Sequence, residues 1–177
     1  MHCLFFDVLP KPGHMAHYFD HVARLKPVLA AHDGLVFLDR YRPLDDADAL
    51  LSHQLWADEA AIAKWRADAT HRASQSAGRK IHFDGYRIRV GEEIAQDQAS
   101  LETGRFLLAA YGSAPATLPG ARSYESVNHE GRFVTLASHD QLGAAARAAA
   151  ASGAPQTRLF RILRDYTLTD RAEAPQP

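Results

Sequence analysis

The chain has 177 residues, of which 46% are hydrophobic and 23% charged, the proportions of an ordinary soluble globular protein with one domain or two small ones. Twenty Lys and Arg side chains face 21 Asp and Glu side chains, so no net field attracts nucleic acid or an anionic membrane surface. The ten histidines show neither HExxH spacing nor a Cys/His cluster. We therefore expect no nucleic-acid partner, no membrane partner and no metal.

The first apolar run, CLFFDVL at residues 3–9, predicts a strand. It is too short for a signal peptide or a membrane span, and Asp7 interrupts it, so we expect a cytoplasmic protein. Cys3 is the single cysteine and has no partner for an internal disulfide, so we expect it to be a buried thiol.

The first half of the chain alternates strands and helices. Residues 13–31 carry apolar side chains every three or four positions, which predicts an amphipathic helix. LVFLDRYR and LLSHQLW predict two strands, Asp58 is placed to cap a second helix, and YRIRV predicts a fourth strand. The order βαββαβ is the ferredoxin-like plan.

The second half repeats this order with one element missing. SAPATLPG, at residues 113–120, stands where the first helix should be and is too short and proline-rich to form one. We predict an α+β protein with two tandem ferredoxin-like modules, residues 1–95 and 105–170, joined by a polar linker at 96–104. The second module is degenerate, and the C-terminal DRAEAPQP is expected to fray.

A single ferredoxin-like module leaves one face of its sheet uncovered. Two arrangements would cover it. The other repeat can do so, which makes the chain an intrachain pseudo-dimer, or a second copy can do so, which makes a homodimer.

The stretch LWADEAAIAKWRADATHRASQSAGR, followed by DGYRIRV, resembles the second helix and last strand of the antibiotic biosynthesis monooxygenase superfamily. The resemblance covers residues 1–95 and implies a dimeric α+β barrel. The superfamily includes cofactor-free oxygenases of anthrone-type polyketides, haem-degrading enzymes and quinol oxygenases, so the fold alone does not fix the reaction.

The resemblance also implies roles for particular residues. In the cofactor-free oxygenases, an asparagine and a tryptophan of the third strand line the pocket; Trp56 matches the tryptophan, and Ser52 takes the asparagine's place. Against the haem-degrading members, Trp65 matches a helix tryptophan, but Gln75 stands where the iron-ligating histidine is needed and Asp7 falls near an asparagine. Glutamine is a poor haem ligand, so haem degradation is disfavoured and we expect no cofactor.

His71, Gln75 and Arg79 follow one another at intervals of four residues and share a helix face. This stripe has two interpretations. In the functional one, His71 accepts a proton and Arg79 clamps an anion at the mouth of a pocket; in the other, the stripe is a solvated outer face. A straight helix would turn His71 away from Trp65, so the functional interpretation needs a bend, which Asp68 could produce by capping a new turn.

Other histidines and arginines are further candidates for a site. His53 points to the face of its strand opposite Trp56 and is the second candidate base. Three further histidines form an i, i+3, i+7 stripe without a carboxylate, which favours no metal: His14, His17 and His21. Arg87 and Arg89 share one strand face, and on the barrel side they would need carboxylate partners or a bound anion.

Together these features predict a cofactor-independent monooxygenase acting on a flat aromatic or quinol-like small molecule. The candidate catalytic bases are His71 and His53, and the candidate substrate-binding residues are Ser52, Trp56, Trp65, Gln75 and Arg79. The alternative is a non-catalytic small-molecule-binding or stress-related protein of the same fold, which the missing asparagine favours.

Overall fold

The computed structural model of the protein describes residues 1–175, in which eight strands form one closed antiparallel barrel. The elements, in chain order, are β1 (His2–Pro10), α1 (Met15–Ala30), β2 (Leu35–Pro43), β3 (Leu50–Trp56), α2 (Glu59–Ala67), α3 (Ala69–Ala77), the π-helical turn η1 (Gly78–His82), β4 (Phe83–Ile94), β5 (Thr103–Gly112), β6 (Arg122–Ser126), β7 (Phe133–Gln141), α4 (Leu142–Ala151) and β8 (Gln156–Thr167). The α+β class and the predicted element order are confirmed.

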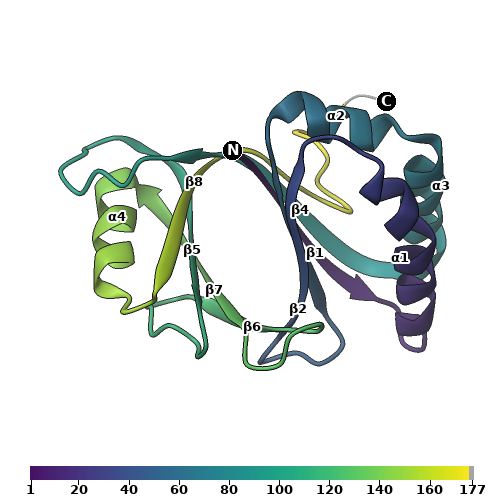
Figure 1. Ribbon diagram of the computed structural model, residues 1–177, viewed down its shortest axis with the longest axis horizontal. Helices are drawn as coiled ribbons and strands as arrows, with labels where there is room; N and C mark the ends of the chain where they lie inside the picture. The colour runs from purple at the N-terminus through teal and green to yellow at the C-terminus, as the bar shows by residue number, and fades with distance from the viewer. Residues whose placement is uncertain (176–177) are drawn as a thin grey trace.

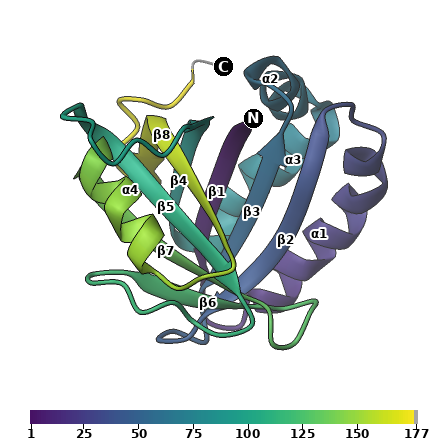
Figure 2. The same ribbon diagram turned by 60° about the vertical axis from the view of Figure 1, so that its left-hand side comes forward.

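The two halves of the chain face each other across the barrel. Helices α1, α2 and α3 lie outside strands β1 to β4, and α4 lies outside the strands of the second half (Figures 1 and 2). Residues 113–121 form turns and irregular chain, so the second half has no counterpart of α1.

The barrel closes within the chain, in the strand order β1-β3-β2-β6-β7-β5-β8-β4. Two antiparallel seams join the halves: β2 pairs with β6, and β4 pairs with β8 from Arg87 opposite Thr167 to Ile94 opposite Leu159. The second repeat therefore covers the sheet face that the first leaves open. Of the two arrangements expected from the sequence, the structure shows the intrachain one, in which the other repeat of the same chain covers the sheet.

Side chains from both halves fill the barrel interior. Because strand residues alternate between faces, one face of each strand supplies this core, which includes Phe5, Leu51, Leu107 and Phe160. The opposite face of the first four strands meets the helices and forms separate apolar clusters, one of which holds Trp56 and Trp65. In the second half, the apolar cluster between α4 and the strands contains several buried alanines.

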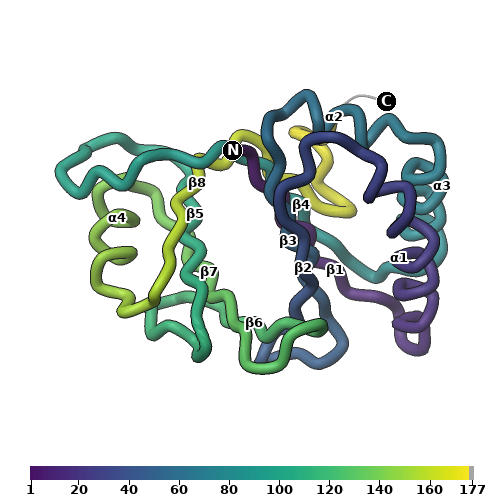
Figure 3. Tube along the Cα trace, viewed as in Figure 1, coloured from purple at the N-terminus to yellow at the C-terminus, as the bar shows by residue number. Residues whose placement is uncertain are grey.

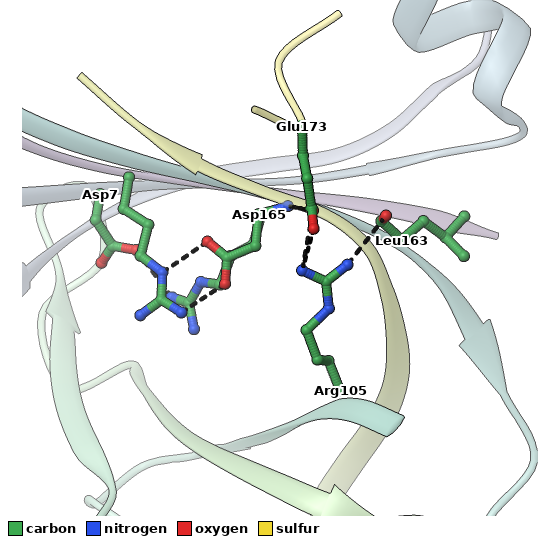
Figure 4. Close-up of polar contacts among 7 residues, drawn as sticks. Asp7, Arg105, Leu163, Asp165 and Glu173 are labelled. Carbon is green, nitrogen blue, oxygen red and sulfur yellow. Dashed lines mark hydrogen bonds and ion pairs between the residues drawn. The ribbon is translucent and has the colours of Figure 1, made fainter. Parts of the chain in front are cut away.

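Both arginines that β4 directs into the barrel have carboxylate partners, as expected. Arg89 donates to Asp7 at 2.8 Å, and Arg87 donates to Asp165 of β8 at 2.8 Å through Nε and 2.5 Å through Nη2. Asp7 also accepts from the hydroxyl of Tyr124, on β6, at 3.1 Å. Figure 4 shows Asp7 and Asp165 within this group of contacts. The contacts of Arg87 with Asp165 and of Tyr124 with Asp7 connect the two halves, and Asp7 neutralises the buried guanidinium of Arg89.

The second helical segment breaks at Asp68, which ends α2 and begins α3. Its backbone leaves the helical region, with φ −57° and ψ 132°, and its carboxylate accepts from the backbone N–H of His71 at 2.9 Å. Asp58 caps α2 in the same way, because its carboxylate accepts from the backbone N–H of Ala61 at 2.8 Å. The predicted cap at Asp58 and the predicted bend at Asp68 are both confirmed.

The chain beyond β8 folds back against the barrel. The carboxylate of Glu173 accepts from Arg105 of β5 at 2.8 and 2.9 Å and from the backbone N–H of Asp165 at 2.7 Å (Figure 4). The segment then runs beside α2 (Figures 1 and 3). The expectation that residues 170–177 fray is wrong for 170–175, because the Glu173–Arg105 ion pair and the hydrogen bond from Arg171 to Tyr86 hold them. Residues 176 and 177 lie outside the described residues.

Within residues 1–175, no helix is both long enough and apolar enough to cross a membrane.

Candidate functional site

A cavity of about 400 Å³ lies between the outer sheet face of the first half and the segment from α2 to η1. Apart from Phe83 at the start of β4, the sheet side is formed by even-numbered residues, such as Leu4, Gln54 and Ile88, because alternation points these toward the helices. A smaller apolar chamber of about 40 Å³ shares part of the same walls. The aromatic residues that line the larger cavity are Phe6, Trp65, Phe83, Tyr86 and Tyr166.

The stripe predicted on the second helical segment lines this cavity. His71, Gln75 and Arg79 are all part of the wall, together with Trp65. The break at Asp68 makes this possible, since it redirects α3 so that His71 returns to the side of Trp65. The structure therefore brings together four of the residues that the sequence singled out.

His71 lies parallel to the indole of Trp65, with ring centroids 4.0 Å apart and planes 13° apart. Its Nδ1 is 2.9 Å from the backbone carbonyl of Trp65. A carbonyl oxygen can only accept, so Nδ1 carries the proton in the neutral ring and Nε2 keeps a lone pair. One residue thus supplies both the stacking surface and the contact that fixes the tautomer.

The surroundings of His71 favour its neutral form. Burial lowers the pKa of the imidazole below its ordinary 6.5, although the Trp65 carbonyl and the carboxylate of Asp68 act in the opposite direction. His71 is therefore neutral at pH 7 and can accept a proton at Nε2. This is the state that a general base requires.

A polar chain on β3 runs from the core to the cavity. The indole N–H of Trp56 donates to Oε1 of Gln54 at 3.0 Å, and Nε2 of Gln54 donates to the hydroxyl of Ser52 at 3.3 Å. Gln54 lines the cavity, while Trp56 is fully buried in the apolar cluster beneath the helices. Ser52 and Trp56 therefore lie behind Gln54, which the sequence interpretation missed although strand alternation places it on their face.

His53 lies on the other face of the same strand, inside the barrel. It is fully buried, stacks on Phe5 with centroids 4.2 Å apart, and has Nε2 2.7 Å from the hydroxyl of Tyr111. Burial lowers the pKa of its imidazole to about 3. The sheet thus separates the two candidate bases, and only His71 lines the cavity.

The C-terminal segment contributes residues that no local pattern indicates. Tyr166 of β8, Arg171 and Pro175 all line the cavity, although they lie in the second half of the sequence. The side-chain N–H of Arg171 donates to the hydroxyl of Tyr86 at 2.6 Å. The cavity is therefore built by both halves of the chain.

The histidine stripe on α1 meets His82 of η1. His14 Nδ1 is 3.0 Å from His82 Nδ1, and the ring of His17 lies 4.9 Å from that of His82. His21 instead has Nδ1 3.1 Å from the hydroxyl of Ser74. Among residues 1–175, no group of three or more His, Cys, Asp or Glu side chains is arranged to hold a metal ion.

The structure is an α+β barrel with a cavity between its sheet and its helices. Residues 1–77 match the family described as antibiotic biosynthesis monooxygenase. The resemblance stated from the sequence is thereby confirmed.

Individual relatives cover the chain unevenly. It is 34% identical over 95 residues to jasmonate monooxygenase ABM of Pyricularia oryzae, which is 54% of this chain and 44% of that protein. It is 29% identical over 139 residues to small ribosomal subunit protein uS4 of Desulforamulus reducens, which is 78% of this chain and 62% of that protein. The chain thus spans less than two thirds of both curated relatives.

The fold extends over both halves in a solved structure. The crystal structure of aldoxime dehydratase superposes with a TM-score of 0.51 and covers 91% of this chain and 80% of that one, at 9% sequence identity. At this identity the likeness shows a shared fold alone.

Proposed function

We propose that this protein is a cofactor-independent monooxygenase that acts on a flat, acidic phenolic or quinol-like molecule bound between Trp65 and the sheet. The observation that carries the proposal is the state of His71: a neutral imidazole in the cavity wall, with Nδ1 committed to the Trp65 carbonyl and Nε2 left as the acceptor. The match of residues 1–77 to a monooxygenase family and the name of the 34% identical relative support the same reaction class.

The proposed reaction starts with removal of a proton from an activated carbon by Nε2 of His71. The resulting carbanion transfers an electron to O₂, and the two radicals combine to form a carbon–oxygen bond. The peroxide takes the proton back, and loss of water from a CH–OOH group leaves a carbonyl. One oxygen atom stays in the product and the other leaves as water, so a CH₂ group is oxidised and no external reductant is needed.

The cavity residues would support the anionic intermediate. Gln54 Nε2 has two hydrogens, of which Ser52 accepts one, so the amide can offer the other to an enolate oxygen. This amide stands in for the asparagine that the third strand lacks. Trp65 provides a flat wall, and Gln75 and Arg79 extend the polar side of the cavity.

The test is oxygen uptake with 1,8-dihydroxyanthrone in buffer containing EDTA, compared with uncatalysed autoxidation. The wild-type protein should consume one O₂ per anthraquinone formed, and His71→Ala should reduce the enzymatic rate by about 10²–10⁴-fold, the usual contribution of a positioned base. His17→Ala, on the exposed side of α1, is the matched control and should retain the full rate. Oxygen uptake that persists in His71→Ala would contradict the assignment.

A non-catalytic binding protein is the second candidate, favoured by Ser52 in the position of the asparagine. It predicts saturable binding of the same compound without oxygen uptake. The name of the second curated relative would suggest a ribosomal role, but the charge of this chain does not favour one. Nucleic-acid binding relies on an excess of Lys and Arg, whereas this chain has a net charge of −1.

A further inference from the structure

We propose that the cavity binds an organic carboxylate, and that the C-terminal strap, residues 168–175, completes the binding site by supplying Arg171. The inference rests on the proposed function, in that it assigns a charged group to the substrate of the same cavity. It also gives the second half of the chain a role in the site.

The lining of the cavity carries several positive charges and, among residues 1–175, no carboxylate that would compensate them. Four arginines line it, and none of the described residues in its wall is Asp or Glu: the arginines are Arg66, Arg72, Arg79 and Arg171. None of these four forms an ion pair with a carboxylate of residues 1–175.

Seven of the twelve arginines that do not line the cavity form ion pairs with carboxylates of residues 1–175. Arg87 and Arg89 have carboxylate partners, as does Arg164, which lies beside the smaller chamber and contacts Glu59 at 2.5 Å. A cluster of guanidinium groups around a concave apolar site favours an anion, because bidentate hydrogen bonds to a carboxylate are matched to the planar guanidinium fork.

Arg171 is held in a fixed place at the mouth of the cavity. One N–H donates to Tyr86, and the guanidinium carbon lies 5.8 Å from the centre of the Tyr166 ring. A guanidinium has five N–H donors, so this arrangement leaves others for a ligand. Arg66 of α2 and Tyr166 of β8 line the same cavity as Arg171. Arginines from both halves of the chain therefore line one cavity.

The strap is anchored on both sides of Arg171. Before it, the backbone N–H of Leu168 donates to the carbonyl of Tyr86 at 3.2 Å, and that of Thr167 donates to the carbonyl of Asp170 at 2.8 Å. After it, Glu173 is held by Arg105, and Pro175 reaches the walls of both the cavity and the smaller chamber (Figure 4). Glu173 is therefore a positioning residue for Arg171.

The remaining walls define the body of the ligand. Trp65, Phe83 and Tyr86 provide flat apolar surface, and a volume of about 400 Å³ accommodates a ring system of drug-like size. The chemical class is thus a flat hydrophobic molecule with one carboxylate, which accepts hydrogen bonds from Arg171.

The test is direct binding of two probes of equal shape, 2-naphthoate and 2-naphthamide, by isothermal titration calorimetry at pH 7.5 and low salt. Naphthoate should bind at least about tenfold more tightly than the amide, since hydrogen bonds to charged groups are stronger than neutral ones. Arg171→Ala should weaken naphthoate binding about ten- to a hundredfold and leave the affinity for naphthamide within about twofold of the wild-type value. Arg171→Lys should recover part of the loss because it keeps the charge but not the fork.

Two further variants separate position from charge. Glu173→Gln keeps Arg171 but weakens its anchor, so naphthoate affinity should fall while amide affinity stays unchanged. Arg132→Ala removes an equal charge from the exposed β6–β7 hairpin and should change neither affinity. Far-UV circular dichroism checks that each variant is folded.

Equal affinities for the two probes, absence of naphthoate binding, or an Arg171→Ala variant with an unchanged affinity ratio would each overturn the proposal. The readout is binding and does not depend on oxygen uptake. A protein that binds naphthoate as expected but consumes no oxygen with 1,8-dihydroxyanthrone would refute the proposed reaction and leave the carboxylate site standing. The reverse result would refute the carboxylate site alone.

Discussion

The imidazole of His71 lies face to face with the indole of Trp65, 4.0 Å away, and is held there by the carbonyl of Trp65 itself. A residue six positions earlier in the chain thus fixes the orientation, the tautomer and the low polarity around the candidate base. The break at Asp68 brings the two residues back together.

Trp65→Ala should destabilise the protein by about 3–5 kcal/mol, because Trp65 is only 4% exposed and its removal leaves a cavity beneath α2. Trp65→Phe retains an aromatic ring and should cost less. Urea denaturation followed by circular dichroism measures both. A loss below about 1 kcal/mol for Trp65→Ala would contradict the packing described for this helix.

Asp68→Ala should cost about 1 kcal/mol, since it removes the capping bond to the backbone of His71. Asp58→Ala is the matched control, because it removes the equivalent cap of α2 at a similar cost but leaves His71 in place. Only Asp68→Ala should also lower oxygen uptake. Equal activities of the two variants at equal stability would show that the break does not position the base.

The pH profile of oxygen uptake should show an acid limb controlled by His71. Its pKa lies below 6.5 because of burial, and the base works only when unprotonated. The rate should therefore be level near neutral pH and decline as the pH falls through an apparent pKa below 6.5. His71→Gln should abolish this limb along with most of the rate. An acid limb that survives in His71→Gln would assign the titration to another group.

Stability at acid pH should depend on His53. Its pKa is lowered to about 3 in the folded protein, while an unfolded histidine titrates near 6.5, so protons bind preferentially to the unfolded state. The stabilisation is complete above pH 6.5 and is lost as the pH falls from 6.5 to about 3, by up to roughly 5 kcal/mol at 1.36 kcal/mol per pKa unit. His53→Gln keeps a polar partner for Tyr111 without titrating.

Urea denaturation at several pH values between 3 and 7 measures this dependence. The slope of the unfolding free energy against pH should be shallower in His53→Gln than in the wild-type protein. His71→Gln serves as a comparison, since His71 titrates on the other side of the sheet. Identical slopes for the wild type and His53→Gln would contradict the assignment.

Asp7→Ala should destabilise the protein by about 3–5 kcal/mol, because it leaves the guanidinium of Arg89, which is 8% exposed, without its carboxylate. It also removes the acceptor for Tyr124 across the barrel. The double substitution Asp7→Leu with Arg89→Met removes both charges and should recover part of the loss. If Asp7→Ala unfolds as readily as the wild type, the ion pair does not stabilise closure.

Local features of the chain were predictable from the sequence. Alternation located β3 at residues 50–56 and placed Arg87 and Arg89 on one face, and the requirement for buried charge to be paired anticipated their carboxylate partners. Capping chemistry at Asp58 and Asp68 depends on side chains within three residues, so the helix start and the bend could both be read from the sequence.

The position of each candidate residue relative to the others was only partly predictable. The stripe of His71, Gln75 and Arg79 follows from helix periodicity, and the structure places it on the cavity. Gln54 could have been found, since it alternates with Trp56 on one strand face. Alternation also indicated that His53 faces away from Trp56, but not that this face is the interior of a closed barrel.

Closure of the barrel and docking of the strap were decided by the tertiary structure alone. The β2–β6 and β4–β8 seams join segments far apart in the chain, and their register depends on two complete sheets meeting. Arg171 and Tyr86 are 85 positions apart, and the contact of Glu173 with Arg105 spans 68. Periodicity and capping report interactions within a few residues, so the sequence determined the elements and the stripe. Long-range packing determined which side chains share the cavity.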